Sequence, residues 1–323
     1  MNIDRFNSLN KKLNKLMPLI TPTGVVLALI LGSIFAPLKP IVNPLFGVMT
    51  FLGAMKISFK DMLDALKKPL FIIVFALASY IAMPLLAELI SVLFFSANKS
   101  LGIGYNLVRA IPTAVVGSIW AGIYQGNIAV SLAILLLDTA LAPFMTPFML
   151  KIFTGTAVQI DSVGMMKSLV FMVVIPFALG LVFNHFCKKQ IKEYLGPISN
   201  PFSKIILLFV IIINVSQVSK RIIEEASWTY VLVAMAAVIL ALVGFPVGYC
   251  LCRIFKLKRN ETVSITFAVA MRNISAALVL AIGYLPESAA LPVIFSIVFQ
   301  QTTAAIMGHA FFAKETIEKT EHD

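Results

Sequence analysis

The chain has 323 residues, of which 59% are apolar and 13% are charged, and its formal net charge is +11. A soluble domain is about half apolar and about a quarter charged. The composition therefore excludes a water-soluble enzyme, a disordered chain and a secreted disulfide scaffold. Cationic cytoplasmic loops of a membrane protein explain the positive charge, so no nucleic-acid partner is expected. The three cysteines, Cys187, Cys250 and Cys252, are too few and too clustered for a zinc site.

The first 17 residues are polar and basic. Apolar side chains recur there every three or four residues among lysines, a pattern typical of a helix lying in the membrane interface. The apolar positions are Ile3, Phe6, Leu9, Leu13 and Leu16, and the lysines are Lys11, Lys12 and Lys15. We therefore predict an interfacial amphipathic helix over residues 1–17. No cleavable signal peptide is predicted, because no small-residue cleavage site follows a short apolar core.

The rest of the chain divides into apolar segments separated by polar or turn-forming residues. A membrane-spanning helix needs about 20 apolar residues, and open strands cannot satisfy their backbone in lipid. Ten spanning helices are predicted, over residues 18–37, 41–57, 69–96, 101–124, 127–152, 164–186, 201–219, 227–252, 260–284 and 289–312. The predicted fold is all-α and integral to the membrane, with five helices in residues 18–153, five in residues 164–313 and a cytoplasmic tail in residues 314–323.

Loop charge and internal similarity indicate how these helices are oriented. Eighteen Lys and Arg residues lie in loops on one predicted side and six on the other, which puts both termini in the cytoplasm and the protein in the cell membrane. The segment LGSIF at 31–35 is similar to LGLVF at 179–183, and NPLF at 43–46 is similar to NPFS at 200–203. Because each set holds an odd number of helices, the second must be inverted, as in secondary transporters.

Two of the predicted spans are interrupted near their centres. Pro112 removes a backbone donor in the fourth span, with Gly117 and Ser118 shortly after it, and the ninth span carries Arg272 and Asn273. Mid-span proline and glycine also occur in ordinary packed helices. A charge at the bilayer centre costs at least ~2.5 kcal/mol, so Arg272 needs a partner or a ligand. We expect breaks at residues 112–118 and 268–275, with the transport site between them.

Short segments spread along the whole chain are similar to segments of a known transporter family. They are TFLGAMKIS at 50–58, IAMPLLA at 81–87, GNIAVSL at 126–132, LAPFMTP at 141–147, VQID at 158–161 with IPFALG at 175–180, and TVSI at 262–265 with MRN at 271–273. These segments resemble the bile acid:sodium symporter family. The resemblance implies ten helices in a panel and a core domain, with the fourth and ninth helices unwound and crossing at the substrate site.

The sodium ligands that the resemblance implies are only partly present. Ser118, Ser131 and the carbonyls of Val269 and Met271 remain as candidate sodium ligands. The positions that depart from the family pattern are Ser79, Gly117, Leu135, Ala268 and Arg272, where the family has Gln, Ser, Thr, Glu and Gln. A carboxylate is lost and a guanidinium is gained, so sodium coupling is doubtful and a changed mechanism, proton-coupled or uncoupled, is favoured. No other cofactor is expected.

A permanent cation could replace the bound one. Counting from the turn at residues 125–127 places Asp138 at the depth of the break in the fourth span, where it would meet Arg272. The pair is either a structural ion pair or a coupling element in which Arg272 attracts an anion and Asp138 tunes it or titrates. The candidate substrate-binding residues are Arg272, Asn273, Thr113, Ser118 and Ser275. A second, mostly structural pair is expected between Glu88 and Arg109, which lie at matched depths.

The sequence thus predicts a secondary transporter of a small organic anion, with a carboxylate-type substrate and the lipid bilayer as its partners. A sodium-coupled symporter with altered ligands is an alternative, as is a channel or sensor on a transporter scaffold. An intramembrane enzyme would need a Ser118–His309 dyad, but His309 lies near the inner end of its span and the protein is not expected to be an enzyme.

Overall fold

The computed structural model describes residues 3–57, 60, 67, 69–154, 161–224 and 227–320. The first part of this chain forms α1 (Ile3–Ile30), α2 (Gly32–Phe35), the 3₁₀ helix η1 (Ala36–Ile41), α3 (Val42–Ala54), α5 (Pro69–Ala76), η2 (Leu77–Ala82), α6 (Met83–Phe95), α7 (Lys99–Ala110), α8 (Val115–Ile123) and α9 (Ile128–Thr154). The second part forms α10 (Ser162–Leu169), η3 (Val170–Val174), α11 (Ile175–Gln190), η4 (Ile191–Leu195), α12 (Gly196–Ser216), α13 (Ser219–Glu224), α14 (Trp228–Ile254), α15 (Arg259–Ala270), α16 (Ile274–Tyr284), η5 (Glu287–Ala289) and α17 (Ala290–Thr320). The described residues are thus almost entirely helical, as predicted.

Three of the long helices contain a π-helical turn immediately before a proline. The turn η2 precedes Pro84, η3 precedes Pro176 and η4 precedes Pro197. A proline lacks the backbone N–H that would bond four residues back, and a π-helical turn is one way to rearrange the bonds around that gap. The rearrangement in η2 has a functional consequence, because this turn carries two side chains of the candidate site.

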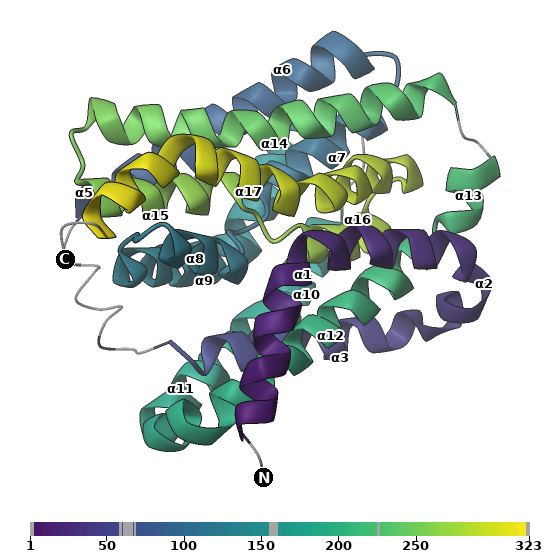
Figure 1. Ribbon diagram of the computed structural model, residues 1–323. Coiled ribbons are helices and arrows are strands. Elements are labelled where there is room, and N and C mark those ends of the chain that lie inside the picture. Colours follow the sequence, from purple (N-terminus) through teal and green to yellow (C-terminus); the bar gives the residue numbers. More distant parts are fainter. Residues whose placement is uncertain are drawn as a thin grey trace.

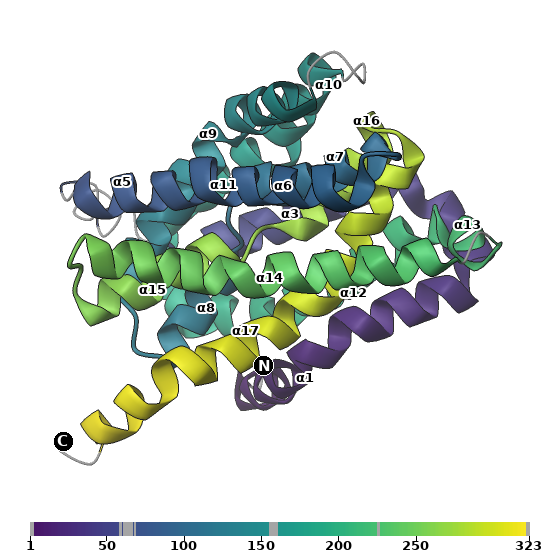
Figure 2. The ribbon, with the colours of Figure 1, turned by 90° about the horizontal axis from the view of Figure 1, so that it is seen from above.

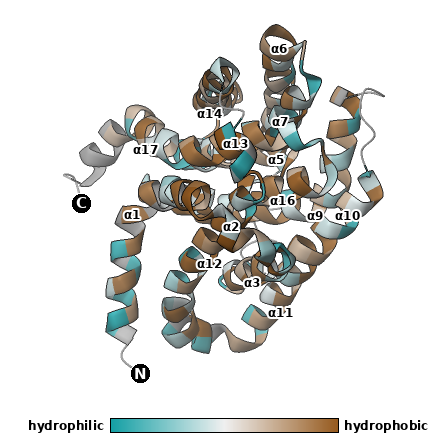
Figure 3. Ribbon diagram, turned by 90° about the vertical axis from the view of Figure 1, so that its right-hand side faces the viewer, coloured by the Kyte–Doolittle hydropathy of each residue, from teal (hydrophilic) through white to brown (hydrophobic). Residues whose placement is uncertain are grey.

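The N-terminal helix α1 is one continuous helix from Ile3 to Ile30, so no break separates the predicted interfacial segment from the first span. Figure 1 shows that α1 bends along its length. Pro22 lies inside this helix and lacks a backbone donor. Figure 3 shows hydrophilic residues concentrated on the part of α1 nearest the N-terminus. Phe6 in this part packs against Phe202 of α12, with ring centroids 6.4 Å apart.

The helices pack into two groups. In the first, which we call the α3/α12 group, α12 packs against α1 and α3, and α3 also packs against α11. In the second, the α7/α15 group, α7 packs against α6, α9, α16 and α17, and α15 packs against α5, α8, α9 and α14, with α14 running between α6 and α17 (Figure 2). The groups meet where α1 contacts α17 and α12 contacts α16. The candidate site lies between them.

Among the residues that the structure describes, seven helical stretches are long and apolar enough to cross a membrane. The other predicted spans correspond to α1 and to two broken helix pairs, α7 with α8 and α15 with α16. Large apolar side chains are exposed along one face of α6 and the turn before it, including Ile81, Leu85, Leu89 and Leu93, which is 65% exposed. An apolar stripe of this size facing outward is typical of contact with lipid.

Candidate functional site

The two broken helix pairs meet through their backbones. α7 ends at Ala110 and α8 begins at Val115, while α15 ends at Ala270 and α16 begins at Ile274. Between these ends, Thr113 and Arg272 form an antiparallel bridge. The N–H of Ala114 donates to the carbonyl of Met271 (2.9 Å), and that of Asn273 donates to the carbonyl of Pro112 (2.8 Å). These bonds satisfy unwound backbone that lipid could not satisfy.

The breaks are shorter than the sequence indicated. Gly117 and Ser118 already belong to α8, and Ala268 still belongs to α15. The cause of the first break is local: Ile111 precedes a proline, which disfavours helical geometry, and its backbone is extended (φ −69°, ψ 147°). The second break has no proline, and its unwound segment is held instead by the bonds to the first break.

Arg272 is enclosed on all sides. Its side chain is 1% exposed, and Nη1 lies 3.3 Å from Oδ2 of Asp138. The same nitrogen donates to Oγ of Ser79 (3.3 Å), and the guanidinium carbon lies 5.9 Å from the centre of the Phe75 ring. Its backbone N–H donates to Oε1 of Gln300 (3.0 Å). Nε and Nη2 are buried without a hydrogen-bond partner.

Asp138, on α9, joins three structural elements. Its Oδ2 also accepts the backbone N–H of Thr113 (2.6 Å), and its Oδ1 accepts the hydroxyl of Tyr80 from the π-helical turn η2. Three donors thus stabilise one carboxylate. Among the described residues Asp138 is the only buried acidic side chain. The ion pair that the depth argument predicted is present, with Tyr80 and Ser79 as partners that the sequence did not indicate.

The second predicted ion pair is absent among the described residues. Glu88 instead accepts a hydrogen bond from Nδ2 of Asn106 (2.7 Å). Arg109 is 1% exposed, and its Nε and Nη1 have no hydrogen-bond partner. The prediction matched depth in the membrane, but depth does not determine which way a side chain points around its helix. Asn106, one turn earlier on α7, is the residue that contacts Glu88.

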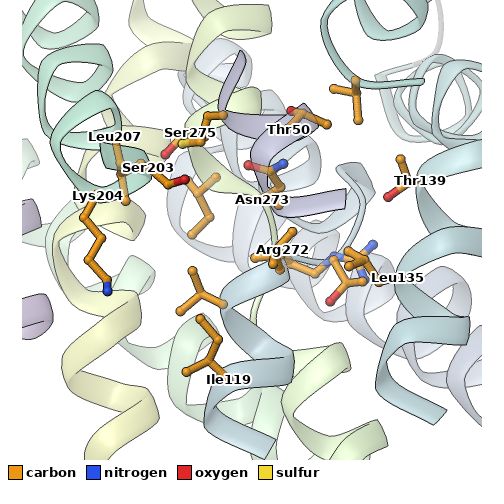
Figure 4. A pocket seen from close by; sticks show the side chains of 18 of the residues that line it. Thr50, Ile119, Leu135, Thr139, Ser203, Lys204, Leu207, Arg272, Asn273 and Ser275 are labelled. Carbon is orange, nitrogen blue, oxygen red and sulfur yellow. The ribbon is translucent and has the colours of Figure 1, made fainter. Parts of the chain in front are cut away.

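A cavity of about 190 Å³ lies between the two groups of helices. From the α3/α12 group it is lined by residues that include Thr50, Lys56, Phe177, Asn200, Ser203, Lys204 and Leu207; from the α7/α15 group, by residues that include Thr113, Ala114, Val115, Ile119, Thr139, Asn273, Ser275 and Gln300 (Figure 4). No Asp or Glu is among the described lining residues. Lys56 is exposed, so the cavity reaches the surface there.

Helix N-termini face this cavity. The first residues of α8, Val115 and Val116, and of α16, Ile274 and Ser275, all line it. Backbone N–H groups in the first turn of a helix have no partner within the helix and carry a partial positive charge. Asn273 caps α16, accepting the N–H of Ala276 on Oδ1 (3.4 Å). Its side-chain N–H groups remain as further donors beside the cavity.

The other predicted substrate-binding residues contribute unequally. Thr113 lines the cavity, but its hydroxyl donates to the carbonyls of Ala268 (2.9 Å) and Met271 (3.0 Å). Arg272 lines the cavity too, yet its guanidinium is directed into the protein toward Asp138 and Ser79. Ser118 is not a lining residue and donates within α8 to the carbonyl of Val115 (2.7 Å). No hydrogen bond joins it to His309, which is exposed, so the structure offers no support for a catalytic dyad.

The candidate sodium ligands differ in how free their oxygens are. The carbonyl of Met271 already accepts two hydrogen bonds, from Ala114 and Thr113. Ser131 is buried with an unpartnered hydroxyl, and Val269 lies in the last turn of α15. A sodium ion also needs negative charge nearby, and the one buried carboxylate is neutralised by the permanent charge of Arg272. Of these oxygens, the Met271 carbonyl is therefore already engaged, and the Ser131 hydroxyl is not.

Two lysines of the cavity were not singled out from the sequence, where they counted only as loop charges. Nζ of Lys56 donates to Oδ1 of Asn200 (2.6 Å), and Nζ of Lys204 donates to Oδ1 of Asn10 on α1. The surrounding protein removes water from the Lys56 ammonium and Lys204 repels it, which lowers the pKa of Lys56 to about 8. The sequence around Lys56 does not indicate the lowered pKa, because Asn200 and Lys204, which lie near its ammonium, belong to α12.

This arrangement can be compared with known proteins. The model of the Sodium Bile acid symporter family matches residues 43–225. An uncharacterized protein of Bacillus subtilis, YbaS, is 35% identical over 91% of this chain and 95% of its own length. The chain belongs to the sodium bile acid symporter family. It is therefore a multi-pass membrane protein of a transporter family, as the short segments of its sequence predicted.

Two more distant relatives of this family member carry functional names. A rice protein named probable sodium/metabolite cotransporter BASS3, chloroplastic, is 26% identical over 93% of this chain and 71% of its own length. An uncharacterized sodium-dependent transporter of Bacillus subtilis, YocS, is 23% identical over 84% of this chain and 83% of its own length. These names describe those proteins. Together with the family match they support a membrane transporter here.

Proposed function

We propose that this protein is a secondary transporter that moves a small organic anion, of carboxylate type, across the cell membrane by alternating access. The observation that carries the proposal is the cavity between the two groups of helices. Two helix N-termini and two lysines line it, and no acidic side chain does so among the described residues. A volume of about 190 Å³ is below the roughly 300–1,000 Å³ of pockets for drug-sized ligands, which favours a small metabolite over a steroid.

The carboxylate of the substrate binds at the N-termini of α8 and α16. The backbone N–H groups of Val115 and Val116 in α8 and of Ser275 in α16, together with the Asn273 amide, supply donors, whereas the N–H groups of Ile274 and Ala276 are already bonded to Arg272 and Asn273. Discontinuous helices that present their positive ends to an anion are the usual device of such transporters. Arg272 acts from behind the break: its charge lies under the unwound backbone and holds that backbone in place.

Coupling in this proposal does not use sodium. Arg272 supplies a permanent positive charge in the core, and Asp138 is the one buried acid through which a proton could act, since protonation would weaken its hold on Arg272 and on the backbone of Thr113. Ten spanning helices in two inverted sets, with both termini in the cytoplasm, complete the proposal. The loop charges support this orientation.

Uptake by proteoliposomes tests the proposal. Purified protein is reconstituted, and entry of labelled pyruvate, lactate, succinate and glutarate is measured with sodium present or replaced by choline, each with and without a pH gradient. We expect saturable uptake of at least one anion that survives replacement of sodium. Absence of saturable uptake for all four anions would reject the transport proposal, and a linear, non-saturable flux would indicate a channel.

The names of the relatives favour the alternative of sodium coupling. The choline arm separates the two. If uptake collapses without sodium and rises with the square of its concentration, other oxygens substitute for the missing ligands and the sodium-independent mechanism is wrong.

A further inference from the structure

The cavity has a second cationic end that the proposed carboxylate site does not use. Lys56 follows α3, and Lys204 lies on α12 one turn after Asn200. All three line the cavity from the α3/α12 group, opposite the helix N-termini of the α7/α15 group. Figure 4 shows Lys204 extending from the wall that also carries Ser203 and Leu207, away from Leu135 and Thr139 on the far wall.

Within the part of the chain that the structure describes, neither ammonium is paired with an acidic side chain. Each donates to the oxygen of a neutral amide, Lys56 to Asn200 and Lys204 to Asn10, and neither has a carboxylate partner among the described residues. Two ammonium groups at one end of a cavity make that end positively charged. The two also repel each other, an interaction that contributes to the lowered pKa of Lys56. A bound anion would neutralise the two ammonium charges and reduce the repulsion between them.

The surface between the two ends is largely apolar, with Val173, Phe177, Leu207, Ile211 and Ile297 among the lining residues. A ligand that fills the cavity therefore meets donors, then an apolar stretch, then two cations. We propose that the transported anion is a small dianion, a dicarboxylate with a short apolar spacer, whose second carboxylate binds between Lys56 and Lys204. This inference rests on the proposed function and specifies its substrate class.

Matched ligands test the inference. Glutarate and valerate have chains of equal length and differ in the second carboxylate, so their dissociation constants for the purified protein in detergent, measured by calorimetry at pH 7, isolate its contribution. We expect glutarate to bind about tenfold more tightly or better, because one charge-assisted contact adds about 1.4 kcal/mol. Malonate, succinate and adipate, each beside its monocarboxylate, cover other spacer lengths.

Variants then locate the second carboxylate. The double variant Lys56→Met/Lys204→Met should lose the preference for glutarate and keep the affinity for valerate, whereas Lys56→Arg/Lys204→Arg should keep the preference. Lys167→Met, which removes an exposed lysine of α10 outside the cavity, is the matched control and should change neither constant. Elution as a single species in size exclusion checks that each variant is folded.

The outcomes separate this inference from the function on which it rests. If monocarboxylates bind and no dicarboxylate binds better, the dianion inference fails and the transport proposal stands. A preference that survives in the double methionine variant also overturns the inference, because the second carboxylate then binds elsewhere. If no member of either series binds, the proposed anion site itself is wrong, and the inference falls with it.

Discussion

Oδ2 of Asp138 lies 3.3 Å from Nη1 of Arg272, and both side chains are 1% exposed. The same oxygen accepts the backbone N–H of Thr113 at 2.6 Å. One carboxylate oxygen therefore connects the guanidinium of one broken helix pair to the unwound backbone of the other. A buried charge that loses its partner is strongly destabilising, so the pair maintains the crossing whether or not it also takes part in coupling.

A double-mutant cycle measures this connection. Asp138→Asn leaves the Arg272 charge without compensation and should destabilise the protein by ~3–5 kcal/mol, and Arg272→Gln should cost a similar amount for the converse reason. The double variant, with a neutral amide at each position, should recover much of the loss. Thermal unfolding of the purified proteins in detergent gives the three values. Strict additivity of the two single effects would show that the charges do not interact.

Asn273→Asp tests the anion site without removing the helix cap. Aspartate caps a helix N-terminus as well as asparagine does, so α16 should form normally. The new carboxylate would meet the incoming anion at the cavity, and uptake should fall at least about tenfold, a barrier of roughly 1.4 kcal/mol. Asn98→Asp, at the exposed start of α7, is the matched control and should transport as the wild type does. Unchanged uptake by Asn273→Asp would place the anion elsewhere.

Gly104 tests how closely α7 approaches the end of η5, just before α17. A Cβ added at this residue would lie 2.3 Å from the backbone carbonyl oxygen of Ala289, which cannot move aside as a side chain does. We expect Gly104→Ala to destabilise the protein by ~1–3 kcal/mol. Gly283 on α16 has open space at the same position, so Gly283→Ala should be neutral or slightly stabilising. The difference between their melting temperatures is the measurement, and equal values would contradict this packing.

Anion affinity should depend on pH through Lys56. Its pKa is lowered from 10.5 to about 8, because the protein desolvates its ammonium and Lys204 repels it, with Asn200 as its hydrogen-bond acceptor. The ammonium is charged below pH 8 and neutral above it, so affinity for an anion at this end should fall as the pH rises through about 8. Lys56→Arg stays charged and should remove this dependence between pH 7 and 9. Glutarate titrations at four pH values would show it.

The same shift has an opposite effect on folding. The unfolded chain keeps the ordinary lysine pKa and binds more protons than the folded chain between about pH 8 and 10.5. The contribution of Lys56 to stability therefore rises with pH across that window. Weaker anion binding with increasing intrinsic stability would distinguish titration of Lys56 from general alkaline unfolding.

Local chemistry made the crossing predictable from the sequence. Pro112 disfavours helical geometry at the preceding Ile111, and the distance from the turn at residues 125–127 gave the depth of Asp138 correctly. The length of the breaks was not predictable, because the bridge between Thr113 and Arg272 joins segments far apart in the chain. The pairing of Glu88 with Arg109 was wrong for a related reason: depth follows from counting, but orientation around a helix depends on neighbours.

The loop-charge rule, from which the orientation is predicted, does not distinguish the cavity lysines from other lysines. Counting loop charges treats every lysine alike. Only the packing of α3 against α12 places Lys56 and Lys204 at the cavity. The continuity of α1 was also not predicted. Its first half has an amphipathic pattern and its second half is apolar, so the sequence suggested two separate helices. Tyr80 and Ser79 reach the core through the π-helical turn before Pro84, a local rearrangement that regular helical periodicity does not describe.

The backbone bridge between Thr113 and Arg272 has a mechanical consequence. Two backbone hydrogen bonds join the two breaks, and the Thr113 hydroxyl and Asp138 each contact both of them. The two broken helix pairs, α7 with α8 and α15 with α16, are therefore linked at the point where each pair is interrupted. Rotation of one pair relative to the other would break the hydrogen bonds between the breaks, and lipid offers no replacement for them. Relative movement of the two groups of helices would therefore have to carry this joint as one unit.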